Sequence, residues 1–196
     1  MATFSLVHGA WGLGLQWDLV RAELEARGHT VHTPDLPCEE TGATAEDYAA
    51  CVPAADVVVG HSMAGYVIPC VEAQLRVFLC ALYGPREADT FVPGFGDARA
   101  IDELGRSYYP DPADAVRELQ YPPDYAHLAA NLRRQAPLPL GAMCTEGVYV
   151  VCARDACINP DWQRQAPFPH VELDAGHMPM LECPRELAEI LGALAE

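Results

Sequence analysis

The segment Val57–Tyr66 constrains the fold of this chain more than any other part of its sequence. Its three consecutive valines are typical of a strand that is buried on both faces of a sheet. Gly60 permits a sharp turn after the strand, and the small residues Ala64 and Gly65 allow a helix to begin close to that turn. Ser62 would then lie at the tip of a strained strand-to-helix turn, with its hydroxyl exposed. The usual pattern for such a turn is G-x-S-x-G, from which Ala64 departs by one methyl group.

Segments with strand and helix patterns alternate along most of the chain. The predicted strands are rich in apolar and β-branched residues and lie at 3–8, 30–33, 57–59, 76–82, 147–153 and 170–173. The predicted helices lie at 17–27, 44–51, 63–73, 161–165 and 184–195. This alternation predicts right-handed crossovers and an α/β fold, with a mostly parallel sheet of about six strands and helices on both faces.

The character of the sequence changes between residues 85 and 146. Prolines and tyrosines are frequent there, and only short helical patterns occur, near 97–106, 112–119 and 124–134. We interpret this stretch as a short helical lid inserted between two strands of the sheet. A length of 196 residues suits one domain with a sizeable core, so we predict a single domain over residues 1–196 with the lid at about 85–146.

Composition excludes several classes of function. The formal charge of −16 disfavours binding to the phosphate backbone of a nucleic acid. All twelve basic residues are arginines, and the absence of lysine rules out a Schiff base, a pyridoxal-phosphate anchor and the lysine of a P-loop. None of the eight cysteines forms a C-x-x-C pair or a Cys/His cluster with zinc spacing. We therefore expect no metal and no organic cofactor.

Membrane and export signals are also missing from the sequence. No apolar run approaches the length of a membrane span, and no basic segment precedes the first predicted strand. We therefore expect a cytoplasmic protein that acts on a small-molecule substrate and binds neither nucleic acid nor membrane.

Two further polar residues follow predicted strands in positions that suit Ser62. Asp155 comes two residues after the strand at 147–153, and His177 follows the strand at 170–173. Because open α/β sheets place their sites at the carboxyl ends of parallel strands, we expect the three side chains to converge. A serine hydroxyl needs an imidazole to accept its proton, and the imidazole needs a carboxylate that fixes its tautomer.

Asp155 has rivals for the carboxylate role. Asp174 is the main one, because it lies close to His177 in the sequence, and Asp89 is a weaker one. The sequence favours Asp155 because it directly follows a buried strand.

Backbone amides would complete this arrangement with an oxyanion hole. One N–H would come from Met63, directly after the serine, and the other from Ala10, in the turn after the first strand. Gly9 leaves room for the substrate carbonyl, which a side chain at that position would crowd. The residues expected to line the substrate pocket, each equally consistent with simple packing, are Gly9, Trp11, Leu13, Tyr83 and Met178.

These residues and their order along the chain resemble the α/β-hydrolase superfamily, and within it the branch of methylesterases and hydroxynitrile lyases with their bacterial relatives. The motifs that carry the resemblance are His8–Trp11, Asp35–Pro37, Gly60–Gly65, Asp155 with Ile158, and Gly176–Leu181. The resemblance implies an α/β-hydrolase fold with Ser62 as nucleophile, His177 as base and Asp155 as orienting acid, and with Ala10 and Met63 as oxyanion donors.

Two positions separate this chain from the lyases of that branch. The lyases typically carry a threonine in place of Gly9 and a lysine directly after the histidine, where this chain has Met178. The sequence therefore looks esterase-like. It also begins at what the family counts as its third strand, so the two antiparallel strands of the family are expected to be absent.

The sequence thus predicts a carboxylesterase-type serine hydrolase that cleaves a carboxylic ester, a thioester or a lactone through an acyl-enzyme. One alternative is a cofactor-free lyase, decarboxylase or cyclase that uses the same pocket for proton transfer. Another is a non-catalytic binder of a small molecule. The missing strands would leave a sheet edge exposed, which would suit a homodimer. The acyl group, the alcohol and the pathway are not encoded in any motif of the sequence.

Overall fold

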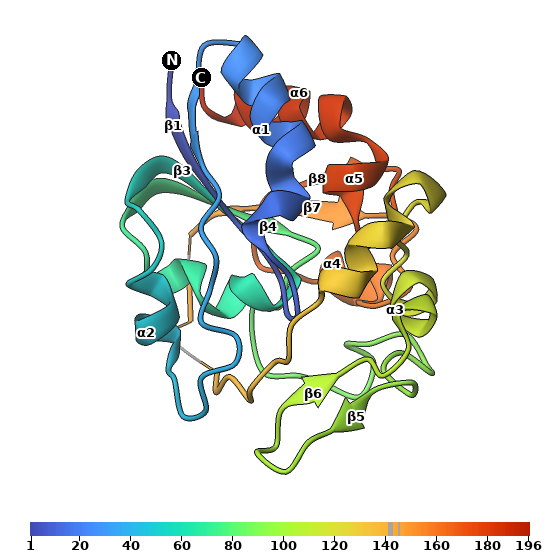
Figure 1. Cartoon of the computed structure of the whole chain (residues 1–196). Coiled ribbons are helices and arrows are strands. Elements are labelled where there is room, and N and C mark those ends of the chain that lie inside the picture. Colours follow the sequence, from blue (N-terminus) through green and yellow to red (C-terminus); the bar gives the residue numbers. More distant parts are fainter. Residues whose placement is uncertain (141–142, 145) are drawn as a thin grey trace.

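The computed structural model describes residues 1–140, 143–144 and 146–196 of the chain. Its centre is a sheet of six strands in the order β2-β1-β3-β4-β7-β8, in which every neighbouring pair is parallel. The strands are β1 (Thr3–Val7), β2 (Thr30–His32), β3 (Ala55–His61), β4 (Ala73–Leu79), β7 (Val148–Cys152) and β8 (His170–Leu173). The prediction of a mostly parallel sheet of about six strands is confirmed (Figure 1).

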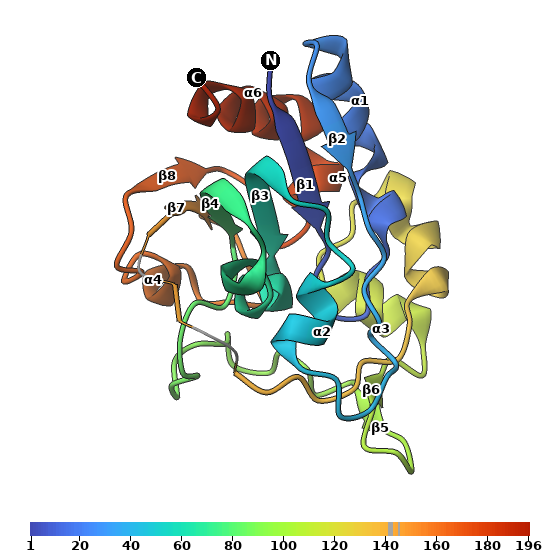
Figure 2. The same ribbon diagram turned by 90° about the vertical axis from the view of Figure 1, so that its left-hand side faces the viewer.

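Helices cover both faces of this sheet, as predicted. The helices are α1 (Asp18–Ala26), α2 (Ala45–Ala49), α3 (Pro112–Glu118), α4 (Pro160–Gln163), α5 (Pro179–Glu182) and α6 (Pro184–Leu194). α1 and α6 pack against each other on one face, and α2 lies on the other (Figure 2). Alternate residues of β3 enter the two resulting cores, with Val57 and Val59 on the α1 side and Val58 on the α2 side. None of the helices in the described residues has both the length and the apolar composition needed to cross a bilayer.

The chain after Ser62 differs from the predicted helix at 63–73. The structure has two short 3-10 helices there, Ser62–Tyr66 and Ile68–Cys70, and β4 begins at Ala73. Pro69 lies in the second of these turns and lacks the backbone N–H that a continuous helix would use. The close approach that the small residues predicted is present, because a Cβ at Gly65 would overlap the carbonyl oxygen of Leu82.

The segment between β4 and β7 lies beyond the carboxyl ends of the strands (Figure 1). It contains α3, near the predicted helical pattern at 112–119, and a long 3-10 stretch at Pro123–Asn131. The pattern at 97–106 is not helical, which corrects the prediction. It forms a small antiparallel hairpin of β5 (Ala100–Ile101) and β6 (Ser107–Tyr108). Residues 141, 142 and 145, at the end of the predicted lid, lie outside the described part of the chain.

One side chain explains why this hairpin forms. The Asp102 carboxylate accepts the backbone N–H groups of Leu104 and Arg106, which closes the turn between the two strands. It also accepts the guanidinium groups of Arg106 and Arg134 at 2.9 and 2.6 Å. Burial raises the pKa of Asp102, but these hydrogen bonds outweigh burial and hold the pKa well below its usual range. An aspartate that gathers backbone donors in this way favours a turn over a helix.

Candidate active site

Ser62 is the first residue of the turn that follows β3, and its backbone has the positive φ of 54° that a strained elbow requires. The conformation points the side chain away from the sheet and toward the loop after β8. There the Oγ of Ser62 lies 3.2 Å from Nε2 of His177. This distance is within the range in which an imidazole can take the proton of a hydroxyl.

Asp155 and His177 follow β7 and β8, which are neighbouring strands of the sheet. Nδ1 of His177 lies 2.9 Å from Oδ2 of Asp155, and both side chains are almost fully buried. The two rivals of Asp155 lie elsewhere. Asp174 is 83% exposed and pairs with Arg154, while Asp89 is exposed on the surface. The structure therefore brings Ser62, His177 and Asp155 into one hydrogen-bonded series.

The remaining lone pairs of Asp155 are also engaged. Its Oδ1 accepts the backbone N–H groups of Cys157 and Ile158 at 2.7 and 3.0 Å. Its Oδ2 accepts Nε2 of Gln163 at 2.9 Å in addition to the imidazole. Gln163 is fully buried and also accepts the backbone N–H of Cys152, so it fixes the carboxylate relative to the end of β7. The sequence analysis did not identify Gln163, because a glutamine within a short helix carries no motif.

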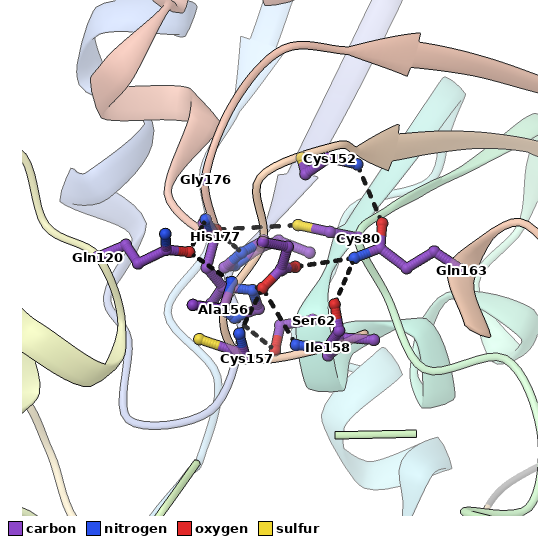
Figure 3. A network of polar contacts seen from close by, with 12 residues as sticks. Ser62, Cys80, Gln120, Cys152, Ala156, Cys157, Ile158, Gln163, Gly176 and His177 are labelled. Atoms are coloured by element: carbon purple, nitrogen blue, oxygen red, sulfur yellow. Dashed lines mark hydrogen bonds and ion pairs between the residues drawn. The ribbon is translucent and has the colours of Figure 1, made fainter. Parts of the chain in front are cut away.

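A second glutamine reaches the same cluster from the segment above the sheet. Oε1 of Gln120 accepts the backbone N–H groups of Ala156 and His177 at 2.7 and 2.9 Å, and its amide nitrogen donates to the carbonyl of Arg154. Figure 3 shows Gln120 and Gln163 approaching His177 from opposite sides. Gln120 thus ties the loop after β7 to the loop after β8. Its backbone has a φ of 59°, which no sequence pattern at this position indicates.

Two buried histidines support the loops around Ser62. His8 accepts the backbone N–H of Leu36 at Nε2, so its proton is on Nδ1, which donates to the carbonyl of Gly9. His61 lies with Nε2 2.8 Å from the backbone oxygen of His177. Burial lowers the pKa of His8 to about 4 and that of His61 well below its usual value, so both are neutral at pH 7. They act as fixed hydrogen-bonding braces.

The two amides expected to form an oxyanion hole flank Ser62. The N–H of Ala10 makes no hydrogen bond to any described residue. Met63 is the second residue of its 3-10 turn, and N–H groups in a first turn have no partner within the helix. Gly9 lies so close to Ser62 that an added Cβ would be 2.8 Å from the Cβ of the serine. A side chain at position 9 would therefore overlap Ser62 or force the loop away.

Ser62 borders two cavities of very different size. The larger has a volume of about 260 Å³, and its walls include Trp11, Tyr66, Phe91, Phe95, Leu138 and Ile158. The smaller has a volume of about 10 Å³ and lies beside His177 and Met178. About one water molecule fits into a space of that size. The site thus offers a roomy apolar chamber on one side of the serine and a niche on the other.

The expected pocket residues divide between these cavities and the core. Trp11 lines both cavities, and Gly9 and Met178 line the smaller one. Leu13 and Tyr83 line neither, which corrects the prediction for both. Tyr83 is stacked on Trp162 with ring centroids 4.2 Å apart, and its hydroxyl donates to the carbonyl of Trp162. Leu13 directly precedes the 3-10 helix Gly14–Trp17, and its backbone caps the first turn of that helix.

Two overlapping groups of side chains near His177 could in principle hold a metal ion. They are His61 with Cys80 and His177, and Asp155 with Cys157 and His177. Their donor atoms are already engaged within the protein, since His61 and Cys80 both contact the carbonyl oxygen of His177. Burial raises the pKa of Cys80 and of Cys157 well above the usual value, so both stay thiols, whereas metals bind thiolates. The geometry suits hydrogen bonding better than metal binding.

Comparisons with known proteins agree with this fold. The model of the alpha/beta hydrolase family matches residues 6–190. Carbendazim hydrolyzing esterase of Nocardioides sp. (strain SG-4G) is 26% identical, with 99% of this chain and 100% of that protein covered. Methylesterase 3 of Arabidopsis thaliana is 24% identical, with 97% and 94% covered. A crystal structure of a pyrethroid hydrolase from Sphingobium faniae JZ-2 superposes with a TM-score of 0.76, at 25% identity and with 98% and 96% of the two chains covered. The chain belongs to the alpha/beta hydrolase family.

Proposed function

We propose that this protein is a serine hydrolase that cleaves a carboxylic ester through an acyl-enzyme on Ser62. The observation that carries the proposal is the hydrogen-bonded series from Ser62 through His177 to Asp155, which opens onto an apolar cavity. Relatives named as a carbendazim hydrolyzing esterase, a methylesterase and a pyrethroid hydrolase support an esterase activity. Thioesters and lactones present the same carbonyl and fall within the proposal.

In the proposed reaction His177 takes the proton of Ser62 as the serine Oγ attacks the substrate carbonyl. Asp155 keeps the imidazole in the tautomer that presents Nε2 to the serine and stabilises the imidazolium that forms. The developing oxyanion would accept the N–H groups of Ala10 and Met63. His177 then protonates the leaving alcohol, and a water molecule activated by the same imidazole releases the acid.

The two cavities favour an ester with a large acyl group and a small alcohol. The leaving group must depart next to His177, and the small niche lies there, with room for about one water molecule or a group of similar size. The acyl group would fill the chamber of about 260 Å³. A methyl ester matches this asymmetry, and a relative named Methylesterase 3 is consistent with it. The niche would also hold the hydrolytic water in the second half of the reaction.

The proton-transfer alternative uses His177 without forming an acyl-enzyme. This alternative gives no reason for the strained backbone conformation of Ser62. A nucleophilic serine benefits from that conformation, because it exposes the hydroxyl. The hydrogen bond between Ser62 and His177 matches the needs of acyl transfer, and so does the N–H of Ala10, which has no partner among the described residues. For these reasons we favour the hydrolase over a lyase, a decarboxylase or a non-catalytic binder.

The test is the reaction of the folded protein with a fluorophosphonate and with methyl hexanoate, an ester with the larger acyl group and the small alcohol that the two cavities favour. We expect one adduct by intact mass, located on Ser62 by peptide mapping, together with ester turnover. Ser62→Ala should abolish both, and His177→Ala should reduce both by at least about a thousandfold. Ser107→Ala is the matched control, because Ser107 lines the same cavity but is not bonded to His177. Folded protein that forms no adduct and turns over no ester would contradict the proposal.

A further inference from the structure

Two arginines of the large cavity differ from the other ten in the chain. Nine arginines form ion pairs with carboxylates, and Arg76 donates to the backbone carbonyls of Ile68 and Val71. Arg86 and Arg99 line the cavity beside Ser62, and neither has a carboxylate within 4 Å in the part of the chain that the structure describes. Among the described residues, the terminal nitrogens of Arg86 and Arg99 have no acceptor, and both arginines lie where a substrate would bind.

The surroundings of Arg99 hold its guanidinium at the cavity wall. The guanidinium carbon lies 5.2 Å from the ring centroids of both Trp11 and Phe95, which also line the cavity. Nε donates to the carbonyl of Gly96, and a Cβ at Gly96 would overlap the guanidinium. Both terminal nitrogens are left without a protein acceptor among the described residues. The N–H groups on these two nitrogens can donate two parallel hydrogen bonds to the two oxygens of a carboxylate.

Glu118 is bonded to the turn that carries Arg99, and its carboxylate is used for another purpose. Its carboxylate accepts the backbone N–H groups of Gly96 and Ala98 and the hydroxyl of Tyr109, at 2.9 to 3.0 Å. These bonds shape the turn that presents Arg99, and Tyr109 in turn packs edge-on against Trp11. Glu118 therefore positions the arginine without neutralising it by direct contact.

The charge of the cavity contrasts with that of the whole chain. The protein has 28 acidic and twelve basic residues, yet the described walls of the cavity include two arginines and no aspartate or glutamate. The other walls are mostly aromatic and aliphatic. A cation beside low-dielectric walls interacts with an anion far more strongly than an exposed cation does. Arg86 is exposed and marks the outer part of the cavity, near Tyr66.

We propose that the substrate carries an anionic group on its acyl part, in the first instance a carboxylate, which binds Arg99 in the cavity and is drawn in by Arg86. The substrate class is then the monoester of a dicarboxylic acid, of which the ester end reaches Ser62 and the free acid end reaches Arg99. This inference rests on the proposed esterase function and assigns the chemistry of its substrate. Ester hydrolysis itself is unchanged: water adds across the acyl C–O bond, the alcohol leaves and a dicarboxylate is released.

The test compares two esters that differ by one charge, monomethyl adipate and its neutral amide, methyl adipamate. We expect kcat/KM to be about 10 to 100 times higher for the anion, because a charge-assisted hydrogen bond contributes about 1.5–3 kcal/mol. The difference should lie mainly in KM, because the contact with Arg99 would be equally strong in the ground state and in the transition state. Equal or better turnover of the amide would overturn the inference while leaving the esterase proposal intact.

Variants of the two arginines test whether they cause the preference for the anionic substrate. Arg99→Gln should remove most of the preference for the anion by lowering kcat/KM far more for monomethyl adipate than for methyl adipamate, and Arg99→Lys should restore part of the preference. Arg86→Gln should reduce it by a smaller factor. Arg185→Gln is the matched control, because Arg185 is an exposed arginine on α6. An equal loss on both substrates in Arg99→Gln would indicate that the arginine only packs, and would contradict the inference.

A binding measurement separates this inference from the proposed function. In Ser62→Ala, which cannot form an acyl-enzyme, calorimetric titration with monomethyl adipate should show a Kd at least tenfold below that for methyl adipamate, and Arg99→Gln in the same background should remove the difference. If the wild-type protein fails to react with a fluorophosphonate but this preference is present, the esterase proposal fails and the anion site stands. If Ser62 reacts and the preference is absent, the anion-site inference is contradicted and the esterase proposal stands.

Discussion

The two sides of Ser62 differ in how completely their polar groups are satisfied. On the side of His177, the Asp155 carboxylate accepts four hydrogen bonds, and Gln120 and Gln163 tie the surrounding loops together. On the side of the large cavity, two arginines have no carboxylate partner and the buried Oε1 of Gln135 has no hydrogen-bond partner among the described residues. We call these the closed side and the open side.

On the closed side the protein itself supplies the hydrogen-bond partners, whereas on the open side a substrate must supply them. Buried polar groups are costly when they are unpaired, and a network that is fully paired holds one geometry. The closed side can therefore hold the imidazole of His177 and the carboxylate of Asp155 in one relative orientation before any ligand binds. The open side is completed only when a ligand of matching chemistry enters. Variants on the closed side should thus lower kcat, and variants on the open side should raise KM.

The largest effect is expected at Asp155. Asp155→Asn keeps the shape of the side chain but removes the charge that stabilises the imidazolium, and it presents an amide N–H where His177 Nδ1–H needs an acceptor. We expect kcat to fall by about 10³- to 10⁴-fold with little change in KM. Steady-state kinetics on methyl hexanoate measures this, with Asp174→Asn as the matched control. A similar loss in the control would show that the exposed rival carries the role.

A smaller loss is expected at Gln120. Gln120→Ala leaves the N–H groups of Ala156 and His177 without their acceptor and frees the loop that carries the imidazole. We expect kcat to fall by about tenfold, consistent with the loss of hydrogen bonds of about 1–1.5 kcal/mol, with KM within about threefold. Gln120→Glu keeps the acceptor and should retain more of kcat than Gln120→Ala. A change confined to KM would place Gln120 functionally on the open side.

The buried histidines make the stability of the closed side depend on pH. The pKa of His8 is about 6.5 in an unfolded chain and about 4 here. Between pH 4 and pH 6.5 the unfolded state therefore binds a proton at His8 and the native state does not. The stabilisation is complete above pH 6.5 and is lost as the pH falls toward 4. We expect the free energy of unfolding to drop by about 2 kcal/mol from this group between pH 7.5 and 5.

Urea unfolding followed by circular dichroism at several pH values measures this drop. His8→Gln should remove the part of the pH dependence that belongs to His8, while His61 continues to contribute in the same direction. Wild type and His8→Gln with parallel stability curves from pH 7.5 to 5 would contradict the assignment.

The smallest effect is expected in the hairpin above the open side. Asp102→Asn weakens the contacts that hold Arg106 and Arg134 and loosens the turn between β5 and β6, of which Ile101, Gly105 and Ser107 line the cavity. We expect KM to rise by about two- to fivefold with kcat nearly unchanged, because the closed side is untouched. Asp114→Asn, which breaks an ion pair on α3 away from the cavity, is the control. A loss in kcat instead would mean that the hairpin also positions the reacting groups.

The sequence predicted the parts that depend on local pattern and strand order. The valines of β3, Ser62 after them, and Asp155 and His177 after β7 and β8 all lie where alternating strands and helices place them. It failed where a single side chain interrupts a local pattern or bonds to a residue far away in the sequence. Pro69 and the early start of β4 remove the predicted helix after Ser62. The bonds that Asp102 makes to its own turn and to Arg134 form a hairpin where a helical pattern was read.

The same distinction holds for the candidate site. Gln120 and Gln163 reach His177 and Asp155 from segments that carry no motif, and only the folded chain brings them there. Arg99 is one arginine among twelve in the sequence, and its lack of a carboxylate partner becomes visible only in three dimensions. Leu13 and Tyr83 were expected in the pocket or, equally, in simple packing, and their contacts with other elements decide where they lie.

The pairing of β7 with β8 has a consequence for sequence divergence. Cys152 lies opposite Leu173 in this ladder, and from these partners the chain runs three residues to Asp155 and four to His177. The spacing of Asp155 and His177 is thus set by backbone hydrogen bonds, which any suitably apolar strand can form. Substitutions within the strands can accumulate without moving the two side chains apart. This explains in physical terms how a chain that is 25% identical to a pyrethroid hydrolase over nearly its whole length can share its fold, with a TM-score of 0.76.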